Sequence, residues 1–194
     1  MRVIAGKYRS RPLRSLPGLD LRPTADRLRE TLFDILTAGN PSALEGSIWI
    51  DLFAGTGAVG IEALSRGAAQ VYFVEAGKRA AELIADNLRS LGLASGFELL
   101  REPSERALGG LRQRGIQAHF IFLDPPYRLR QAYQQVLDAL GVTPLSEGAL
   151  IIAEHEKRFD PGEKFRDFER VRKLEQGDAA LSFYRRSGKV EPQG

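Results

Sequence analysis

Short apolar segments alternate with helical patterns along most of this 194-residue chain. Strands that alternate with helices form a parallel sheet with right-handed crossovers and helices on both faces. Ligands of such sheets bind beside the carboxyl ends of the strands. We therefore expect an α/β fold with its site at that end of the sheet. The predicted strands are 48–53, 71–75, 97–100, 119–123 and 149–154, and the predicted helices are 58–66, 78–91, 103–113 and 130–140.

Both ends of the chain depart from this alternation. Residues 2–6 and 11–16 have the pattern of short strands around a turn, and a helical pattern follows until the break at 38–42. Near the other end, strand patterns at 168–174 and 179–185 predict a closing hairpin. The predicted parts are a basic N-terminal hairpin and helix at 1–40 that pack on the main domain, a main domain at 44–186 and a flexible tail at 187–194.

Composition excludes several kinds of site. The chain has no cysteine, which rules out disulfides, thiolate metal ligands and cysteine nucleophiles. Because it has only two histidines, we also expect no metal site. No apolar run approaches the roughly 20 residues of a membrane span, and no signal peptide opens the chain. These features predict a soluble cytoplasmic protein, and we expect it to act as a monomer.

A glycine-rich loop joins the first predicted strand to its helix. The strand ends at Phe53, and the loop 54–60 follows with the sequence Ala-Gly-Thr-Gly-Ala-Val-Gly. Glycines let the backbone approach a ligand closely, and the start of the next helix offers free N–H groups. The following strand ends in Glu75, where a carboxylate can accept hydrogen bonds from a ribose diol. Glycine turns and solvated strand-end acids are also common, so a purely structural interpretation stays open.

Asp51 separates the two classes of cofactor that fit this loop. A dinucleotide places an anionic pyrophosphate over the glycines, and a nearby carboxylate repels it. S-adenosylmethionine has no phosphate and carries a sulfonium and an ammonium, which carboxylates such as Asp51 and Asp124 attract. The acids therefore favour S-adenosylmethionine over a nicotinamide cofactor.

The tetrapeptide Asp124-Pro125-Pro126-Tyr127 follows the apolar strand Phe120–Leu123 directly. Two prolines cannot continue a strand, so the chain must leave the sheet in a stiff turn. The turn offers a carboxylate, the Pro125 carbonyl and the ring of Tyr127. These groups can hold an exocyclic amine by its protons and stack on the base that carries it. A surface turn with the same residues is the structural alternative.

Positive charge is concentrated at the start of the chain. Residues 1–30 carry eight Lys and Arg against three acids, an excess of five, whereas the whole chain has an excess of three. A basic segment with Tyr8 among its cations suits a phosphate backbone, although a solvated terminus would have the same composition. The candidate RNA-binding residues are Arg2, Lys7, Arg9, Arg11, Arg14, Arg22 and Arg27.

Four motifs in order along residues 2 to about 186 resemble the RsmD-type family of 16S ribosomal RNA guanine-N2 methyltransferases. They are Arg-Val-Ile-Ala-Gly at 2–6, Leu-Arg-Pro-Thr-Ala-Asp-Arg-Leu-Arg-Glu at 21–30, Asp-Leu-Phe-Ala-Gly-Thr-Gly at 51–57, and Asp-Pro-Pro-Tyr at 124–127. Many amino-directed methyltransferases share the last two, whereas the second is much narrower. The resemblance implies a Rossmann-like class I methyltransferase fold with a seven-stranded, mostly parallel sheet.

The resemblance also implies roles for individual residues. S-adenosylmethionine would be the cofactor, and the substrate would be a guanosine of 16S ribosomal RNA within an assembling or assembled small subunit. The implied catalytic residues are Asp124, Pro125, Pro126 and Tyr127, and the implied cofactor-binding residues are Asp51, Phe53, Gly55, Thr56, Gly57, Glu75, Ser104 and Asp124. One departure concerns the adenine contact. The family usually has Asn or Asp there, whereas this chain has Glu102-Pro103-Ser104, so a backbone N–H near Ser104 and Glu102 both stay candidates.

Three other functions fit part of the sequence. An adenine-N6 DNA methyltransferase, or another amino-directed nucleic-acid methyltransferase, would share the Asp-Pro-Pro-Tyr turn. A nicotinamide-dependent oxidoreductase is disfavoured by Asp51 and by the lack of a catalytic His or Tyr/Lys pair after the glycine loop. An RNA-binding module with an inactive pocket is disfavoured by the intact turn.

Overall fold

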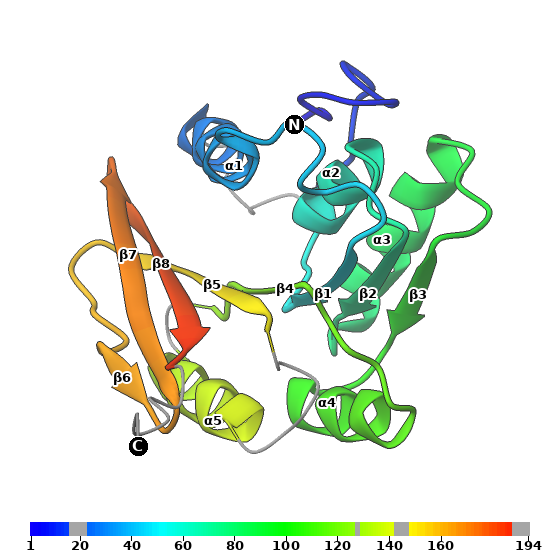
Figure 1. Cartoon of the computed structure of the whole chain (residues 1–194). Helices are drawn as coiled ribbons and strands as arrows, with labels where there is room; N and C mark the ends of the chain where they lie inside the picture. The colour runs from blue at the N-terminus through cyan, green and yellow to red at the C-terminus, as the bar shows by residue number, and fades with distance from the viewer. Residues whose placement is uncertain (16–22, 127–128, 142–147, 188–194) are drawn as a thin grey trace.

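A computed structural model of the chain describes residues 1–15, 23–126, 129–141 and 148–187. One sheet runs through the molecule with the strand order β3-β2-β1-β4-β5-β8-β7-β6 (Figure 1). The strands are β1 (Ile48–Leu52), β2 (Gln70–Val74), β3 (Phe97–Leu100), β4 (Phe120–Leu123), β5 (Leu150–Glu156), β6 (Lys164–Phe165), β7 (Phe168–Gln176) and β8 (Ala179–Arg186). The helices are α1 (Pro23–Thr37), α2 (Ala58–Ser65), α3 (Lys78–Ser90), α4 (Ser104–Gln113) and α5 (Arg130–Gly141).

The first five strands of the sheet are parallel, as the alternating pattern predicts. β1 pairs with β2 and β4, β2 with β3, and β4 with β5, all in the parallel sense. β8 runs antiparallel to β5, and β7 runs antiparallel to β8. The predicted α/β fold, with strands and helices placed within about two residues, is confirmed.

Two details of the prediction are wrong. The described sheet has eight strands rather than seven, because β6 adds a two-residue edge strand beside β7. A strand of two residues is too short to give an alternating pattern. The predicted N-terminal strands at 2–6 and 11–16 are also reduced, within the described residues, to a single bridge between Arg2 and Pro12. Backbone bonds from Val3 N–H to the Arg11 carbonyl (3.0 Å) and from Leu13 N–H to the Met1 carbonyl (3.1 Å) flank this bridge, and the chain turns between the two segments with positive φ at Gly6 and Ser10.

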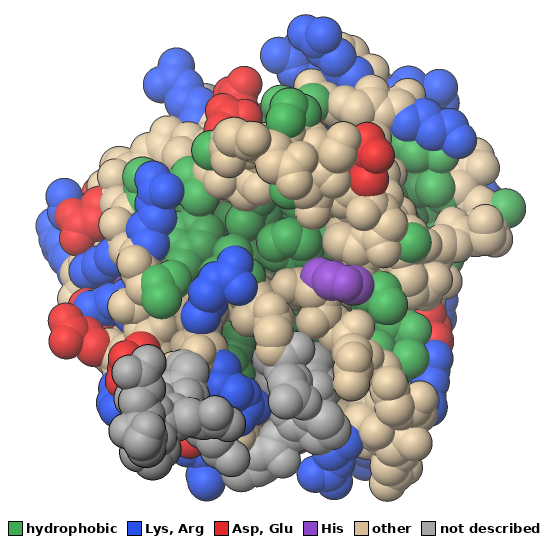
Figure 2. Space-filling model, in the orientation of Figure 1, with side chains coloured by type: hydrophobic (Ala, Val, Ile, Leu, Met, Phe, Trp, Pro, Cys, Tyr) green, Lys and Arg blue, Asp and Glu red, His purple; other side chains and the backbone are tan. Residues whose placement is uncertain are grey.

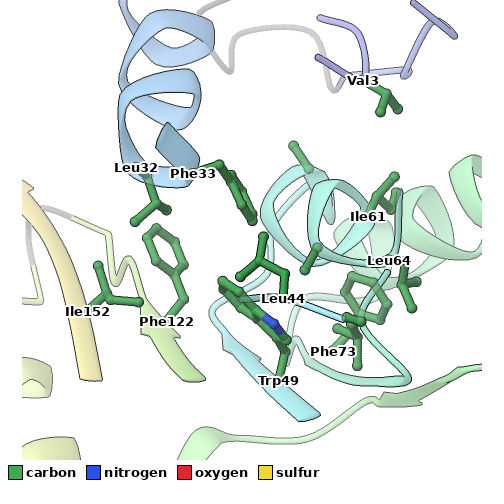
Figure 3. Packing of buried hydrophobic residues seen from close by; sticks show 14 of the residues in the cluster. Val3, Leu32, Phe33, Leu44, Trp49, Ile61, Leu64, Phe73, Phe122 and Ile152 are labelled. Carbon is green, nitrogen blue, oxygen red and sulfur yellow. The ribbon is translucent and has the colours of Figure 1, made fainter. Parts of the chain in front are cut away.

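Helices cover both faces of the sheet. Helices α1, α2 and α3 lie on one face, and α4 and α5 lie on the other (Figure 1). Each face of the sheet has its own hydrophobic core, and successive residues of a strand point to opposite faces. Trp49 of β1 therefore packs in the core on the α1 side and Ile50 in the core on the α5 side. Figure 3 shows Phe33 of α1 and Leu44 directed toward Trp49. The rings of Phe33 and Trp49 stack with centroids 5.5 Å apart, and fully burying side chains of this kind contributes about 1.5–3 kcal/mol each.

The N-terminal segment, residues 1–15, is held against α2 by a buried carboxylate. Glu62 of α2 is fully buried and accepts hydrogen bonds from the backbone N–H groups of Ile4 (2.7 Å) and Ala5 (2.9 Å). Arg66 Nε donates to the same carboxylate at 2.8 Å and neutralises it. A charge can be buried in this way because its lone pairs and its counter-ion are both supplied.

A second polar side chain joins the N-terminal segment to the glycine loop. Asn87 of α3 is fully buried. Its Oδ1 accepts from the Arg14 N–H at 2.8 Å, and its Nδ2 donates to the carbonyl oxygens of Arg14 (3.1 Å) and Thr56 (3.0 Å). The basic segment therefore has a fixed position relative to the loop. Among the described residues, no helix is both long enough and apolar enough to cross a membrane.

Candidate active site

The carboxyl end of β1 turns sharply into the glycine loop. Phe53 has a positive φ of 58°, a conformation that is strained for a bulky side chain. Gly55 and Gly57 follow with φ of 56° and 76°, which glycine adopts without strain. The backbone N–H of Ala54 donates to the Val74 carbonyl at 3.0 Å and ties this turn to the end of β2. A strained residue at the end of a central strand is typical of a functional site.

Asp51 lies beneath the loop rather than at its surface. Only 2% of Asp51 is exposed, and its Oδ2 accepts the backbone N–H of Gly60 at 2.9 Å. Burial raises the pKa of this carboxyl to about 8; the Gly60 N–H opposes the shift, and the charges of Asp124 and Glu75 add to it. Asp51 therefore anchors the first turn of α2 beneath the loop.

Glu75 links the loops that follow β1 and β2. Its Oε2 accepts the N–H of Gly55 at 2.9 Å, and its Oε1 accepts the N–H of Gly77 at 2.7 Å. The side chain is half-buried and lines the cavity described next. This position, at the tip of the second strand, is the one predicted for a ribose-binding acid.

A cavity of about 1030 Å³ lies beyond the strand ends. Its size suits a small-molecule site, since such sites span roughly 300–1,000 Å³. Of the predicted site residues, Phe53, Glu75, Ser104 and Pro126 line it, as do both candidates for the adenine contact, Ser104 and Glu102. The full lining is Phe53, Val74, Glu75, Ala76, Gly77, Glu102, Pro103, Ser104, Glu105, Pro126, Leu129, Arg130, Gln131, Ala132 and Gln135.

The other predicted residues that the structure describes do not line the cavity. Gly55, Thr56 and Gly57 form the loop above Asp51, and Asp51 is close enough to Asp124 for their charges to interact. Asp124 is half-buried at the end of β4, Pro125 is buried, and Pro126 is exposed. The predicted stacking residue Tyr127 lies outside the described residues. Burial raises the pKa of the Asp124 carboxyl to about 7.

A third acid stands next to Asp124. The resemblance to the family implies that its segment, residues 153–156, either faces the RNA or caps the sheet, but the acid itself was not among the predicted site residues. Glu154 of β5 is half-buried, and burial together with the charge of Asp124 raises its pKa well above the ordinary value, while Arg29 opposes that shift. The sequence does carry a signal for it. An acid follows an apolar run here, as it does at Asp51 and Asp124. Because β5 continues past Glu154, no turn marks the residue as a strand end.

The predicted RNA-binding residues that the structure describes are all on the surface. Arg2, Lys7, Arg9, Arg11, Arg14 and Arg27 are exposed, and Arg22 lies outside the described residues. Figure 2 shows Lys and Arg side chains at the top of the molecule, over the N-terminal segment, and also along the left and lower parts of the same face. Arg11 Nη2 donates to the Ser90 carbonyl at 3.1 Å. The described residues hold no group of three or more His, Cys, Asp or Glu that could bind a metal ion.

The model of a protein family described as "Conserved hypothetical protein 95" matches residues 1–185. The chain belongs to this family. The proteins it resembles include several named ribosomal RNA small subunit methyltransferase D, so the resemblance to the RsmD-type family is confirmed.

Three relatives illustrate the similarity. The chain is 34% identical over 190 residues to the "Putative rRNA methyltransferase YlbH" of Bacillus subtilis, covering 97% of this chain and all of the relative. It is 39% identical over 159 residues to the Haemophilus influenzae "Ribosomal RNA small subunit methyltransferase D", covering 81% of this chain and 79% of the relative. A solved structure, the "Putative methyltransferase yhhF from Escherichia coli", superposes with a TM-score of 0.79 at 29% identity, over 97% of this chain and 99% of the other.

Proposed function

We propose that this chain transfers a methyl group from S-adenosylmethionine to the exocyclic N2 amine of a guanosine in 16S ribosomal RNA. The observation that carries the proposal is the convergence of Asp124 and Pro125 with Asp51 and the glycine loop at the carboxyl ends of β1 and β4. Family membership supports ribosomal RNA methylation, because the relatives named above bear that activity in their names.

The cavity and the acids beside it suit the cofactor. Glu75 would bind the ribose hydroxyls, and the wall formed by Glu102 and Ser104 would receive the adenine. Asp51 and Asp124 would attract the sulfonium and the ammonium of S-adenosylmethionine, as they would not attract a pyrophosphate. The chemistry that the bound cofactor supplies is an electrophilic methyl group.

The turn after β4 supplies the groups that a methyl acceptor needs. The lone pair of a guanine amine is delocalised into the ring, which makes the amine a poor nucleophile. If the Asp124 carboxylate and the Pro125 carbonyl accept hydrogen bonds from its two N–H groups, the amine is held in place and its lone pair becomes available. As the N–CH3 bond forms and the S–CH3 bond breaks, the amine loses one proton, to Asp124 or to water. Tyr127 would stack on the ring. Because the base must leave its neighbours to enter, the substrate would be a loop, a bulge or an assembly intermediate that presents one.

A methyl-transfer assay with three acceptors tests the proposal. Purified protein is incubated with tritiated S-adenosylmethionine and small subunits, free 16S ribosomal RNA or duplex DNA, the first two from cells that lack this gene. We expect N2-methylguanosine in the ribosomal RNA, which primer extension then maps to one position. N6-methyladenine in the DNA would support the alternative function, and a lack of transfer to guanine would contradict the proposal.

A further inference from the structure

Three acids lie on one face of the sheet, on or directly after the adjacent strands β1, β4 and β5, and the mechanism above uses only two of them. Asp51, Asp124 and Glu154 each lie two residues after a strand residue whose side chain packs in the core on the α1 side: Trp49, Phe122 and Ile152. Leu52 is in register with Leu123, and Leu123 with Ala153. Asp124 and Glu154 are therefore neighbours across the β4–β5 pair and point to the same side.

Glu154 is held in place by its backbone, while its carboxyl has no hydrogen-bond partner among the described residues. The Tyr133 hydroxyl of α5 donates to the Glu154 carbonyl oxygen at 2.6 Å, which fixes the strand at this point. The side chain is half-buried, so its carboxyl is partly removed from water without a protein donor to replace it. Burying a carboxyl without a hydrogen-bond donor costs free energy, and a bound ligand can offset that cost by supplying the donor.

Arg29 of α1 places a positive charge on the same side of the sheet. The side chain is 5% exposed, and its Nη2 donates to the Arg2 carbonyl at 2.6 Å and to Asp26 Oδ1 at 3.1 Å. Its Nε is buried with no hydrogen-bond partner among the described residues. The charge of Arg29 lowers the pKa of Glu154 against the raising effects of burial and Asp124. Arg29 therefore favours an ionised Glu154, although it does not bond to it.

The edge of guanine next to its amine offers the donor that this carboxyl lacks. In guanine, N1 carries a proton and lies beside the N2 amine. In adenine, the N1 beside the N6 amine has no proton and is an acceptor. A carboxylate next to the amine site therefore attracts guanine and repels adenine. Sites built to bond a particular polar group reject analogues that lack it by large factors, because a buried group is then left unpaired.

We propose that Glu154 accepts the N1–H of the target guanine beside Asp124 and thereby selects guanine over bases with an unprotonated N1. This inference rests on the proposed function and identifies a specificity residue within it. Asp124 holds the amine that reacts, and Glu154 reads the neighbouring ring nitrogen. Donation from N1–H favours the ionised form of Glu154 when the base is bound, which adds to the effect of Arg29.

The test uses RNA with a changed base at the mapped position. One synthetic RNA carries guanine there, and another carries 2-aminopurine, which keeps the reactive 2-amine but has an unprotonated N1. For wild type we expect kcat/KM to be about 100-fold higher with guanine. In Glu154→Leu this preference should fall at least about tenfold, because leucine neither accepts a hydrogen bond from the guanine N1–H nor repels the unprotonated N1 of 2-aminopurine.

Two further variants make the result specific. Glu154→Gln has nearly the same shape as the wild-type side chain. Its amide oxygen can still accept the N1–H of guanine, and its amide nitrogen can donate to the N1 of 2-aminopurine. The preference for guanine should therefore decrease while guanine is still methylated. Glu175→Gln changes an exposed acid of β7 that pairs with Lys157 and should leave the preference unchanged. 2-Aminopurine also lacks the guanine O6, so part of the wild-type preference for guanine has another cause. Only the difference in preference between wild type and each Glu154 variant is therefore assigned to Glu154.

The outcomes separate the inference from the function it rests on. If wild type methylates guanine and both Glu154 variants keep the wild-type preference, the inference is overturned while the proposed function stands. If wild type methylates no guanine, both are overturned. If Glu154→Leu does not fold, the measurement on Glu154→Gln decides, and an unchanged preference in that variant overturns the inference.

Discussion

Individual residues at the strand ends carry unusual protonation behaviour. Burial raises the pKa of Asp51 and of Asp124, and burial with the charge of Asp124 raises that of Glu154. Shifted pKa values of this kind are concentrated at functional sites, because catalytic acids and bases need pKa values matched to their reaction and burial supplies the shift. The proposed role of Asp124 requires its ionised form, since a protonated carboxyl has lost one acceptor.

Replacing Asp124 by Ala should abolish methyl transfer. Without the carboxylate the amine loses an acceptor, and we expect kcat to fall about 10³-fold or more while S-adenosylmethionine still binds. Initial-rate assays with calorimetry of cofactor binding measure the two effects separately. Asp138→Ala, which changes a half-buried acid of α5 that pairs with Arg166, is the matched control and should keep its activity. Retained turnover in Asp124→Ala would refute the assigned role.

The activity should also increase with pH. Because burial raises the pKa of Asp124 to about 7, the reactive carboxylate is scarce below that pH and complete above it. A plot of log kcat/KM against pH should therefore rise with unit slope and bend near 7, where an ordinary aspartate would bend near 4. Within the part of the chain that the structure describes, the titratable groups near Asp124 are Asp51 on β1 and Glu154 on β5, with Arg29 of α1 beyond Glu154. A flat profile across neutral pH would contradict this.

Residues of the site were predictable where the chain also turns. Asp51 precedes a glycine loop, Glu75 ends a strand, and Asp124 precedes two prolines. In each case a local sequence signal marks the acid as lying near the end of a strand, where ligands bind. Glu154 has no such marker, because β5 runs on to Glu156. Its nearness to Asp124 depends on the register of β4 against β5, which pairs segments about thirty residues apart and cannot be obtained from local patterns.

At the level of elements, close packing of α2 on the sheet holds the loop in place. A Cβ added at Gly60 would lie 2.3 Å from Phe73 Cε1 and 2.8 Å from Val71 Cγ1, so no side chain fits there. Gly60 also donates the hydrogen bond that Asp51 accepts. The third glycine of the loop therefore serves helix–sheet contact, whereas Gly55 and Gly57 serve the turn.

Two glycine substitutions should have opposite effects. Gly60→Ala forces α2 away from β2 and should lower the free energy of unfolding by about 1–3 kcal/mol or more. Gly109→Ala, in α4, is the matched control: its Cβ would meet nothing within 4 Å, and the gain in helix propensity should raise stability by up to about 1 kcal/mol. Urea unfolding followed by circular dichroism measures both. Equal stabilities for the two variants would contradict the packing argument.

Elements with long, regular patterns were predicted well, and irregular ones were not. The helices 78–90 and 104–113 were placed within a residue, because their apolar positions repeat regularly over several turns. The N-terminal strands were overestimated, because the segment is fixed by tertiary bonds to Glu62 and Asn87 rather than by a ladder. A sequence pattern carries no trace of such distant partners.

Over the whole molecule, the basic N-terminal segment and the strand-end site form one assembly. Asn87 ties Arg14 to Thr56, so exposed cations are held at a fixed distance from the glycine loop. Phosphate contacts made by this segment would orient an RNA without reading its sequence, and the turn after β4 would act on the single base that enters it.

Charge reversal in the segment should weaken RNA binding alone. With Arg9, Arg11 and Arg14 changed to Glu, we expect a lower affinity for RNA and a plot of log affinity against log salt that is shallower by about 2–3, because up to three phosphate contacts are lost. Filter binding over a salt series gives the slope, and calorimetry should find the S-adenosylmethionine affinity unaltered. An unchanged slope would assign these arginines to a merely solvated surface.

The single tryptophan of the chain is the buried Trp49 of β1. It stacks on Phe33 of α1 and on Phe120 at the start of β4, with centroids 5.5 and 4.6 Å away. The intrinsic tryptophan fluorescence of the protein therefore comes from this residue and reports on the packing of α1 against the centre of the sheet. Loosening of α1 should shift its emission to longer wavelengths even while the strands remain paired.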